Sequence, residues 1–175
     1  GGKVSRLNKI IDFFLFSQNF FGQLYIRDKK IFFNHYKNHI NNICDILRNI
    51  GVNINTVPVL DVSRKISHNI IASRSFSENS TVVSNLGRLC VGFYNKNKIG
   101  TVIKHMPGLG LSKCDSHYKT PIIKASKKEL IKRDFKPFKA CKSLFAMTAH
   151  AVYPKYDSYY TATHSKIIIN EIIRN

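Results

Sequence analysis

Short apolar runs alternate along this chain with segments whose apolar residues recur at helical spacing, and this alternation limits the folds that the chain can adopt. Short apolar runs predict three buried strands, at 54–62, 101–104 and 144–149. Helical periodicity and capping residues predict helices over about 23–50, 78–95, 126–140 and 165–174. The predicted order is helix, strand, helix, strand, helix, strand, helix.

Such an order is typical of a parallel sheet wrapped by helices. The polar residues of interest follow the carboxyl ends of predicted strands, where the TIM-type (β/α) barrel places its chemistry, and that barrel has about eight strands in about 250 residues. We therefore predict an α/β fold in which residues 1–175 are part of a single domain, an incomplete TIM-type barrel whose first and last strands are missing from this sequence. A doubly wound open sheet is the alternative, although no Gly-x-Gly-x-x-Gly follows any predicted strand.

The formal net charge of +18 raises the question of a nucleic-acid partner, because a basic surface binds phosphate through counterion release. The lysines are spread along the chain, without an arginine-rich arm or the aromatic signature of an RNA-binding domain. Lys, Asn, Ile, Phe and Tyr, which have AT-rich codons, are abundant together, so the base composition of the genome is the simpler explanation. We predict no nucleic-acid partner, and a basic nucleic-acid-binding module is the least favoured alternative.

The sequence also argues against a membrane or secreted protein. No stretch approaches the roughly 20 apolar residues of a transmembrane helix, and the first residues lack the apolar region of a signal peptide. The four cysteines form no Cys-x-x-Cys pair, which disfavours a zinc ribbon and a disulfide framework. They are Cys44, Cys90, Cys114 and Cys141. We expect a cytoplasmic protein with no membrane partner.

The longest irregular segment runs from Lys104 to Pro121, directly after the second predicted strand. It is rich in Gly and Pro, begins with Lys104 and His105, and carries Asp115 and His117 two residues apart. Loops of this length inside a compact domain are usually functional or disordered, and this one is dense in titratable groups. The segment is therefore predicted to be an active-site loop.

Other polar residues are expected near the same edge of the sheet. Asp61 lies near the end of the first predicted strand, and His150 directly follows the third. Arg74 lies in the polar connection after the first strand. Asp61 and His150 are candidate pocket residues, with a structural role as the alternative for His150.

The residues of the loop alone leave its chemistry open. Asp115 and His117 could be a turn-capping Asp beside an exposed His, or two ligands of a metal completed by His105 or His150. The absence of a regular ligand spacing makes metal the weaker option, and we predict neither a metal nor another cofactor.

The sequence from Lys104 to Pro121 resembles the K-H-F-P-G-H-G, D-S-H and proline of bacterial family 3 β-N-acetylhexosaminidases. Four other segments agree with that family in the same order, so the resemblance covers almost the whole chain. They are Gly1–Arg6, Asn55–Val62, Arg74–Phe76 and Met147–His150.

The resemblance implies a TIM-type barrel that removes terminal N-acetylglucosamine with retention, through a covalent glycosyl-enzyme. Retaining glycosidases usually pair two carboxylates, but in this family a histidine serves as the acid/base. His117 matches that histidine, and Asp115 matches the carboxylate that holds its ring. The sugar-binding positions of the family match Arg6, Arg74, Lys104 and His105. The implied substrates are muropeptides from peptidoglycan recycling, and the full-length protein is expected to be a monomer.

Two departures from the family pattern accompany the resemblance. Leu109 stands where the family usually has a histidine between two glycines. The nucleophilic Asp of the family lies on a strand beyond residue 175, so we expect it to be absent from this sequence. The alternative reading is a non-catalytic remnant or fragment of the enzyme, inactive on its own.

Overall fold

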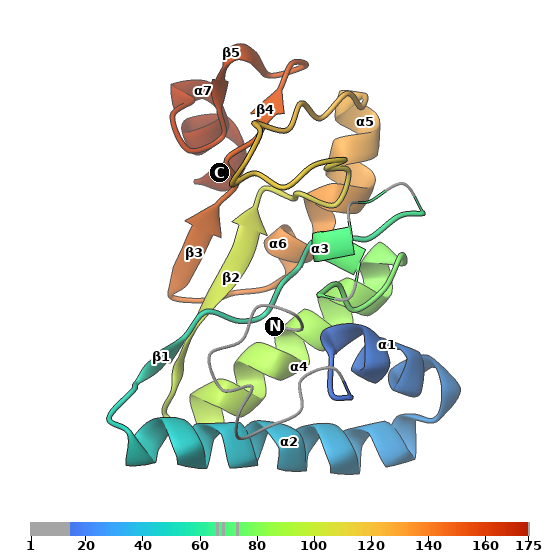
Figure 1. Cartoon of the computed structure of the whole chain (residues 1–175), viewed down its shortest axis with the longest axis vertical. Coiled ribbons are helices and arrows are strands. Elements are labelled where there is room, and N and C mark those ends of the chain that lie inside the picture. The colour runs from blue at the N-terminus through green and yellow to red at the C-terminus, as the bar shows by residue number, and fades with distance from the viewer. Residues whose placement is uncertain (1–14, 66, 68, 73, 175) are drawn as a thin grey trace.

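The computed structural model describes residues 15–65, 67, 69–72 and 74–174. Three parallel strands form a sheet in the order β1-β2-β3, with β2 in the middle (Figure 1). The strands are β1 (Ile54–Asn55), β2 (Gly100–Met106) and β3 (Phe145–Thr148). Because all three strands run the same way, their carboxyl ends lie at one edge of the sheet, as predicted.

The amino-terminal helical region is two helices, where the periodicity predicted one from about 23 to 50. Helix α1 (Gln18–Arg27) ends at Asp28, and α2 (Lys29–Asn49) begins directly after it. The backbone of Asp28 is extended, and its side chain caps α2 by accepting a hydrogen bond from the amide of Ile31 at 3.0 Å. A strong N-cap inside the pattern therefore divides it.

The first strand is much shorter than the predicted 54–62. Only Ile54 and Asn55 pair regularly with β2, because Pro58 has no N–H to donate to the ladder. The segment still follows β2 irregularly: Leu60 donates to the Lys104 carbonyl at 2.7 Å, and Lys104 donates to the Pro58 carbonyl at 3.2 Å. This path places Asp61 beside the end of β2.

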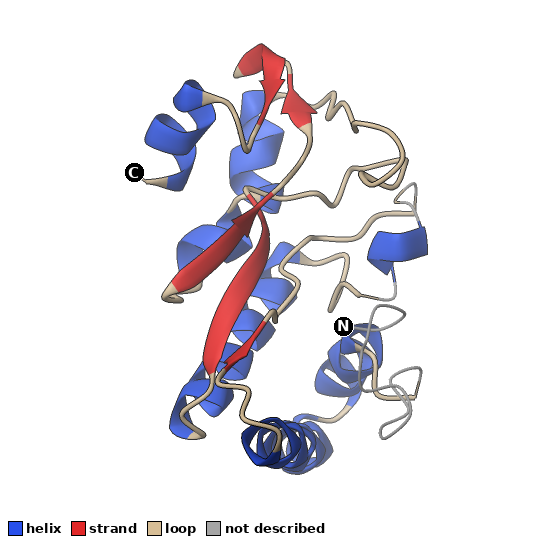
Figure 2. Cartoon of the chain, turned by 60° about the vertical axis from the view of Figure 1, so that its left-hand side comes forward, coloured by secondary structure: helices blue, strands red, loops and turns tan. Residues whose placement is uncertain are grey.

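The short helix α3 (Asn69–Ala72) and the long helix α4 (Ser80–Lys96) follow. The N-cap of α4 is Asn79, whose side chain accepts from the amides of Thr81 and Val82. Ser77 lies in the turn before the helix, where its carbonyl accepts from the Ser75 hydroxyl and its hydroxyl accepts from the Asn79 amide. Helix α4 packs on β2, and α2 crosses the bottom of the molecule beneath it (Figures 1 and 2).

The predicted helix 126–140 is divided into three parts. Helix α5 (Lys127–Glu129) continues as a π-helical turn, η1 (Leu130–Asp134), and then as α6 (Lys136–Ala140) with Pro137 in its first turn. The predicted cap is confirmed, since the Ser126 hydroxyl accepts from the Glu129 amide at 3.2 Å. The helical segment 126–140 is therefore interrupted before Pro137, at the end of η1.

An unpredicted hairpin follows β3, formed by β4 (Val152–Tyr153) and β5 (Asp157–Thr161). It lies above the carboxyl ends of β2 and β3 (Figure 2), and a bridge between Ile122 and Val152 joins it to the end of the long loop. The chain closes with α7 (Lys166–Ile168) and the π-helical turn η2 (Ile169–Ile173).

Two apolar clusters support the sheet and the loop. The larger one lies among α1, α2, α4 and β2, and the smaller one lies among the loop, η1 and the hairpin. The third strand was predicted to be buried, but Phe145 and Met147 are 46% and 40% exposed. Their exposure has a simple cause: among the described residues, β3 pairs only with β2 and forms an edge of the sheet.

Between residues 15 and 174, as far as the structure describes them, the strands close no barrel. In the same residues no helix combines the length and the apolar character that crossing a bilayer requires.

Candidate active site

A carboxylate beneath the sheet edge holds the last residues of β2. Asp61 is fully buried, and its Oδ2 lies 2.8 Å from Nδ1 of His105. Because a carboxylate only accepts, Nδ1 carries the proton of this hydrogen bond, and Nε2 is left as the second functional nitrogen of the ring. Asp61 Oδ1 also accepts from the amide of Leu109 at 2.6 Å. Asp61 therefore positions His105 and the start of the loop from below.

Two buried cations lie beside this carboxylate. Arg74 is 7% exposed and Lys104 is 9% exposed. Burial lowers the pKa of Arg74, and the carboxylates of Asp61 and Asp115 oppose that shift. Burial, together with the positive charge of Arg74, lowers the pKa of Lys104 to about 8, while Asp61 opposes the change. The charges of Arg74, Lys104, Asp61 and Asp115 therefore influence one another. The two cations supply N–H donors suited to hydroxyl and carbonyl oxygens.

Asp115 and His117 form a second carboxylate–imidazole pair at the tip of the loop. Asp115 Oδ1 accepts from the His117 amide at 3.0 Å and lies 2.7 Å from Nδ1 of its ring. The side chain of His117 is 81% exposed, whereas that of Asp115 is 16% exposed. The carboxylate thus fixes the ring through Nδ1 and leaves Nε2 toward solvent, where it can give or take a proton.

The remaining predicted site residues have different positions. Arg6 lies outside the described residues. His150 is exposed just after β3, and its Nδ1 lies 3.0 Å from the Thr163 hydroxyl. That hydroxyl also donates to the Ala149 carbonyl at 3.3 Å. The hydroxyl thus links the His150 ring to the backbone at the end of β3.

Leu109, the departure from the family pattern, is 5% exposed and packs in the smaller apolar cluster. Its side chain contributes to the core, and only its amide reaches the site through Asp61. In this chain an apolar anchor thus occupies that loop position.

Sequence reasoning missed the residues that support the loop from below. They are Arg64, Ser67, Asp134 and Tyr153. The sequence offered one signal: Asp134 is an acidic residue in a segment otherwise dominated by lysine. The structure shows that Asp134 is 1% exposed.

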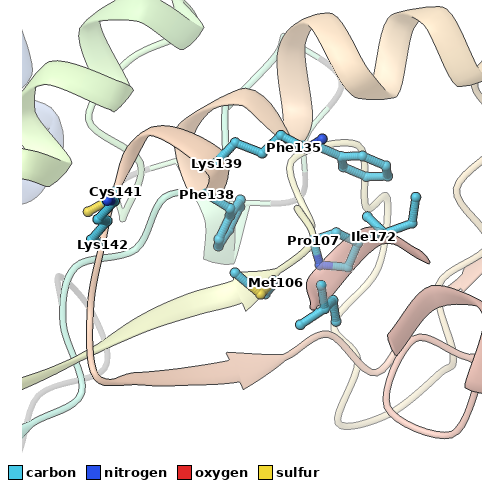
Figure 3. Close-up of a pocket in the computed structure, with 9 residues that line it drawn as sticks. Met106, Pro107, Phe135, Phe138, Lys139, Cys141, Lys142 and Ile172 are labelled. Carbon is cyan, nitrogen blue, oxygen red and sulfur yellow. The ribbon is translucent and has the colours of Figure 1, made fainter. Parts of the chain in front are cut away.

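Within the described ranges, no three His, Cys, Asp or Glu side chains gather as a metal site would require. A pocket of about 200 Å³ lies between α6 and η2, beside the end of β2 (Figure 3). Apolar residues such as Met106, Phe138 and Ile172 line it together with Lys139 and Lys142, and none of the predicted site residues lines it.

Comparison with known proteins identifies the class. The glycosyl hydrolase family 3 N-terminal domain matches residues 35–175, and this chain belongs to that family. In solved structures of the NagZ type the domain is a TIM-type barrel, of which the described residues form an α/β part without closure.

The particular relatives are named as hexosaminidases. The chain is 31% identical over 162 residues to "Beta-hexosaminidase A" of Pseudoalteromonas piscicida, and the alignment covers 90% of this chain and 27% of that protein. It superposes on native NagZ from Neisseria gonorrhoeae with a TM-score of 0.83 at 28% identity, over 91% of this chain and 47% of the other. A family 3 β-N-acetylglucosaminidase from Paenibacillus sp. str. FPU-7 gives 0.72 at 28% identity, over 75% and 26%. The chain thus spans about a quarter to a half of these relatives.

Proposed function

We propose that this chain supplies the acid/base and sugar-binding half of a retaining β-N-acetylhexosaminidase, on a TIM-type barrel. The observation that carries the proposal is the hydrogen bond between Asp115 Oδ1 and His117 Nδ1 at 2.7 Å. Nε2 of His117 protonates the glycosidic oxygen as the bond breaks, and then takes a proton from the water that releases the sugar. Asp115 stabilises the imidazolium that gives the proton in the first step and that forms again when the water is deprotonated in the second; between the two steps the ring is neutral.

The buried cations bind the sugar next to this pair. Arg74 and Lys104 donate hydrogen bonds to hydroxyl groups of the terminal residue, as does Arg6, and His105 joins them through Nε2. Desolvation strengthens these contacts, because Arg74 and Lys104 are nearly buried and little water competes for them. His150 offers its exposed ring to a substrate hydroxyl on the side of β3. No residue of this sequence matches the nucleophilic Asp of the family, and we assign that role outside these 175 residues.

For the substrate, we propose muropeptides that end in β-linked N-acetylglucosamine, handled in the cytoplasm during peptidoglycan recycling. The names of the relatives support the sugar, since they refer to hexosaminidase or N-acetylglucosaminidase activity. We further propose that the protein acts as a monomer without metal, cofactor, membrane or nucleic-acid partner.

The test gives two aryl glycosides to the protein that contains this chain. The protein is expected to hydrolyse 4-nitrophenyl β-N-acetylglucosaminide and to leave the matching β-glucoside intact. Proton NMR of the fresh product should show the β anomer first, because a covalent intermediate retains configuration. Release of the α anomer, or equal turnover of both glycosides, would contradict the proposal.

A further inference from the structure

The loop that carries Asp115 and His117 is held at its base by three hydrogen bonds from distant parts of the chain. We call residues 107–112 the root and residues 113–120 the tip. In the root, the Gly108 carbonyl accepts from the Tyr153 hydroxyl at 2.7 Å. The Gly110 carbonyl accepts from the Ser67 hydroxyl at 2.5 Å, and the Leu109 amide donates to Asp61. Two of these bonds come from residues 61–67 and the third comes from the hairpin, so two separate parts of the chain hold the root.

The root also packs too closely on its supports to admit a side chain at its glycines. A Cβ at Gly110 would lie 2.0 Å from the Val62 carbonyl oxygen, and one at Gly108 would lie 2.7 Å from the Asp134 carbonyl oxygen. Gly108 also has a φ of +142°, which side-chain-bearing residues rarely adopt. The position of the root therefore depends on the segment around Val62 and on η1, which ends at Asp134.

Arg64 joins these two supports. Its guanidinium forms an ion pair with Glu129 and another with Asp134, at 2.7 Å to Oδ2. Its amide donates to the Ser67 hydroxyl, which in turn binds the root. The neighbouring Arg133 connects η1 in the same direction, by donating to the Ser63 carbonyl at 3.3 Å. Arg64 thus ties η1 to the segment that bears Asp61.

The charge balance of this contact favours a geometric role over a stabilising one. Burial raises the pKa of Asp134 to about 6, although Arg64 and Arg133 oppose the shift. Among the described residues, Oδ1 of Asp134 has no hydrogen-bond partner. A buried ion pair whose carboxylate is still disfavoured contributes little net stability, but its fixed geometry can specify one arrangement.

We propose that Arg64 is a positioning residue of this site: by clamping η1 against residues 61–67, it fixes the root and thereby the place of His117. Arg64 touches none of the predicted sugar-binding residues in any contact described above. The proposal rests on the proposed function only for its effect on turnover; the effect on the loop does not depend on it.

The test replaces the guanidinium and keeps the aliphatic stem, with Arg64→Met in the whole protein. Amide hydrogen exchange of peptides covering 107–112 should become at least tenfold faster, and trypsin should cut faster after Lys113 and Lys119. Arg48→Met is the matched control, because Arg48 also has an ion pair, with Asp45, but at the exposed end of α2. Unchanged exchange in the root of Arg64→Met would overturn the proposal.

Kinetics separate positioning from general loss of structure. In Arg64→Met, kcat should fall about tenfold while KM changes less than twofold, since Lys104 and His105 bind the sugar from β2 and Arg74 lies outside residues 61–67. Arg64→Lys should recover part of the lost kcat, because an ammonium can still reach one carboxylate. Equal losses in Arg64→Lys and Arg64→Met, or a change in KM alone, would contradict a positioning role.

Two further arrangements keep the test decisive. If Arg64→Met does not fold, Glu129→Gln removes one of the two ion pairs at a carboxylate that is 42% exposed, and root exchange should rise about threefold; no rise would overturn the proposal. Hydrogen exchange needs no substrate. A protein without hydrolytic activity would therefore refute the proposed function, whereas the exchange result would still decide the role of Arg64.

Discussion

The root and the tip of the long loop are neighbours in sequence but differ in almost every physical respect. The root is mostly buried and is hydrogen-bonded to Asp61, Ser67 and Tyr153. The tip is largely exposed, and the hydrogen bonds of the Asp115 carboxylate to His117 lie within the tip itself. The chain thus separates the anchoring of the loop from its proposed acid/base pair, so substitutions in the two parts should have different consequences.

The largest effect is expected at the tip. His117→Ala removes the group that we propose transfers the proton, and kcat for an aryl β-N-acetylglucosaminide should fall by about 10²- to 10⁴-fold. Chemical denaturation should show the stability changed by less than about 0.5 kcal/mol, because the side chain is exposed. A variant that keeps its turnover would remove His117 from the mechanism, and one that unfolds would break the distinction between tip and root.

The next effect belongs to the root. Gly110→Ala places a methyl group against the Val62 carbonyl oxygen, which is backbone and cannot rotate away. We expect a loss of about 3 kcal/mol in the free energy of unfolding, measured by urea denaturation. Gly92→Ala is the matched control, since a Cβ there meets nothing within 4 Å. Similar stability losses in both variants would show that the clearance at Gly110 is not what matters.

The support beneath the root should respond to pH. Because the pKa of Asp134 is raised to about 6, the folded state binds more protons than the unfolded state between about pH 4 and pH 6. The contribution of this group to stability is therefore present below pH 4 and lost as pH rises through 6, by at most about 3 kcal/mol. Denaturation midpoints of the wild type and Asp134→Asn, compared at pH 4.5 and 7, should differ in slope; parallel profiles would contradict this expectation.

The smallest effect is expected at the surface of the tip. Lys119→Ser changes an exposed side chain, and the stability should shift by less than about 0.5 kcal/mol. Its tryptic cleavage site is removed at the same time, so cleavage after Lys113 can be followed alone. A stability loss above about 1 kcal/mol would mean that the tip is anchored through contacts beyond those described.

Local signals in the sequence were sufficient for some of this molecule. The apolar run before Lys104 and the cap at Ser126 predicted β2 and the start of α5, because each depends on neighbouring residues. Polar residues near the ends of predicted strands indicated that Asp61 and His105 lie close together, since the carboxyl ends of parallel strands share one edge of the sheet. The pairing of Asp115 with His117 was likewise within reach of a two-residue spacing.

Other features were missed because their local signal was weak or because they depend on distant contacts. The β4–β5 hairpin is short and its β5 residues are mostly polar or aromatic, so no alternation of apolar residues marked it. Asp28 divides the first helical pattern through a local hydrogen bond to the Ile31 amide, which the continuous periodicity obscured. Arg64 and Asp134 are 70 positions apart, and nothing near either residue indicates the other.

The bond from the Tyr153 hydroxyl to the Gly108 carbonyl also has a consequence for biosynthesis. Its two residues are separated by 45 positions, so a ribosome completes the segment bearing His117 well before it adds the tyrosine that holds it. During translation the segment lacks this hydrogen bond until Tyr153 has emerged, and the formation of such long-range contacts is slow. In a nascent polypeptide, catalytic competence would therefore come after most of the surrounding architecture has already formed.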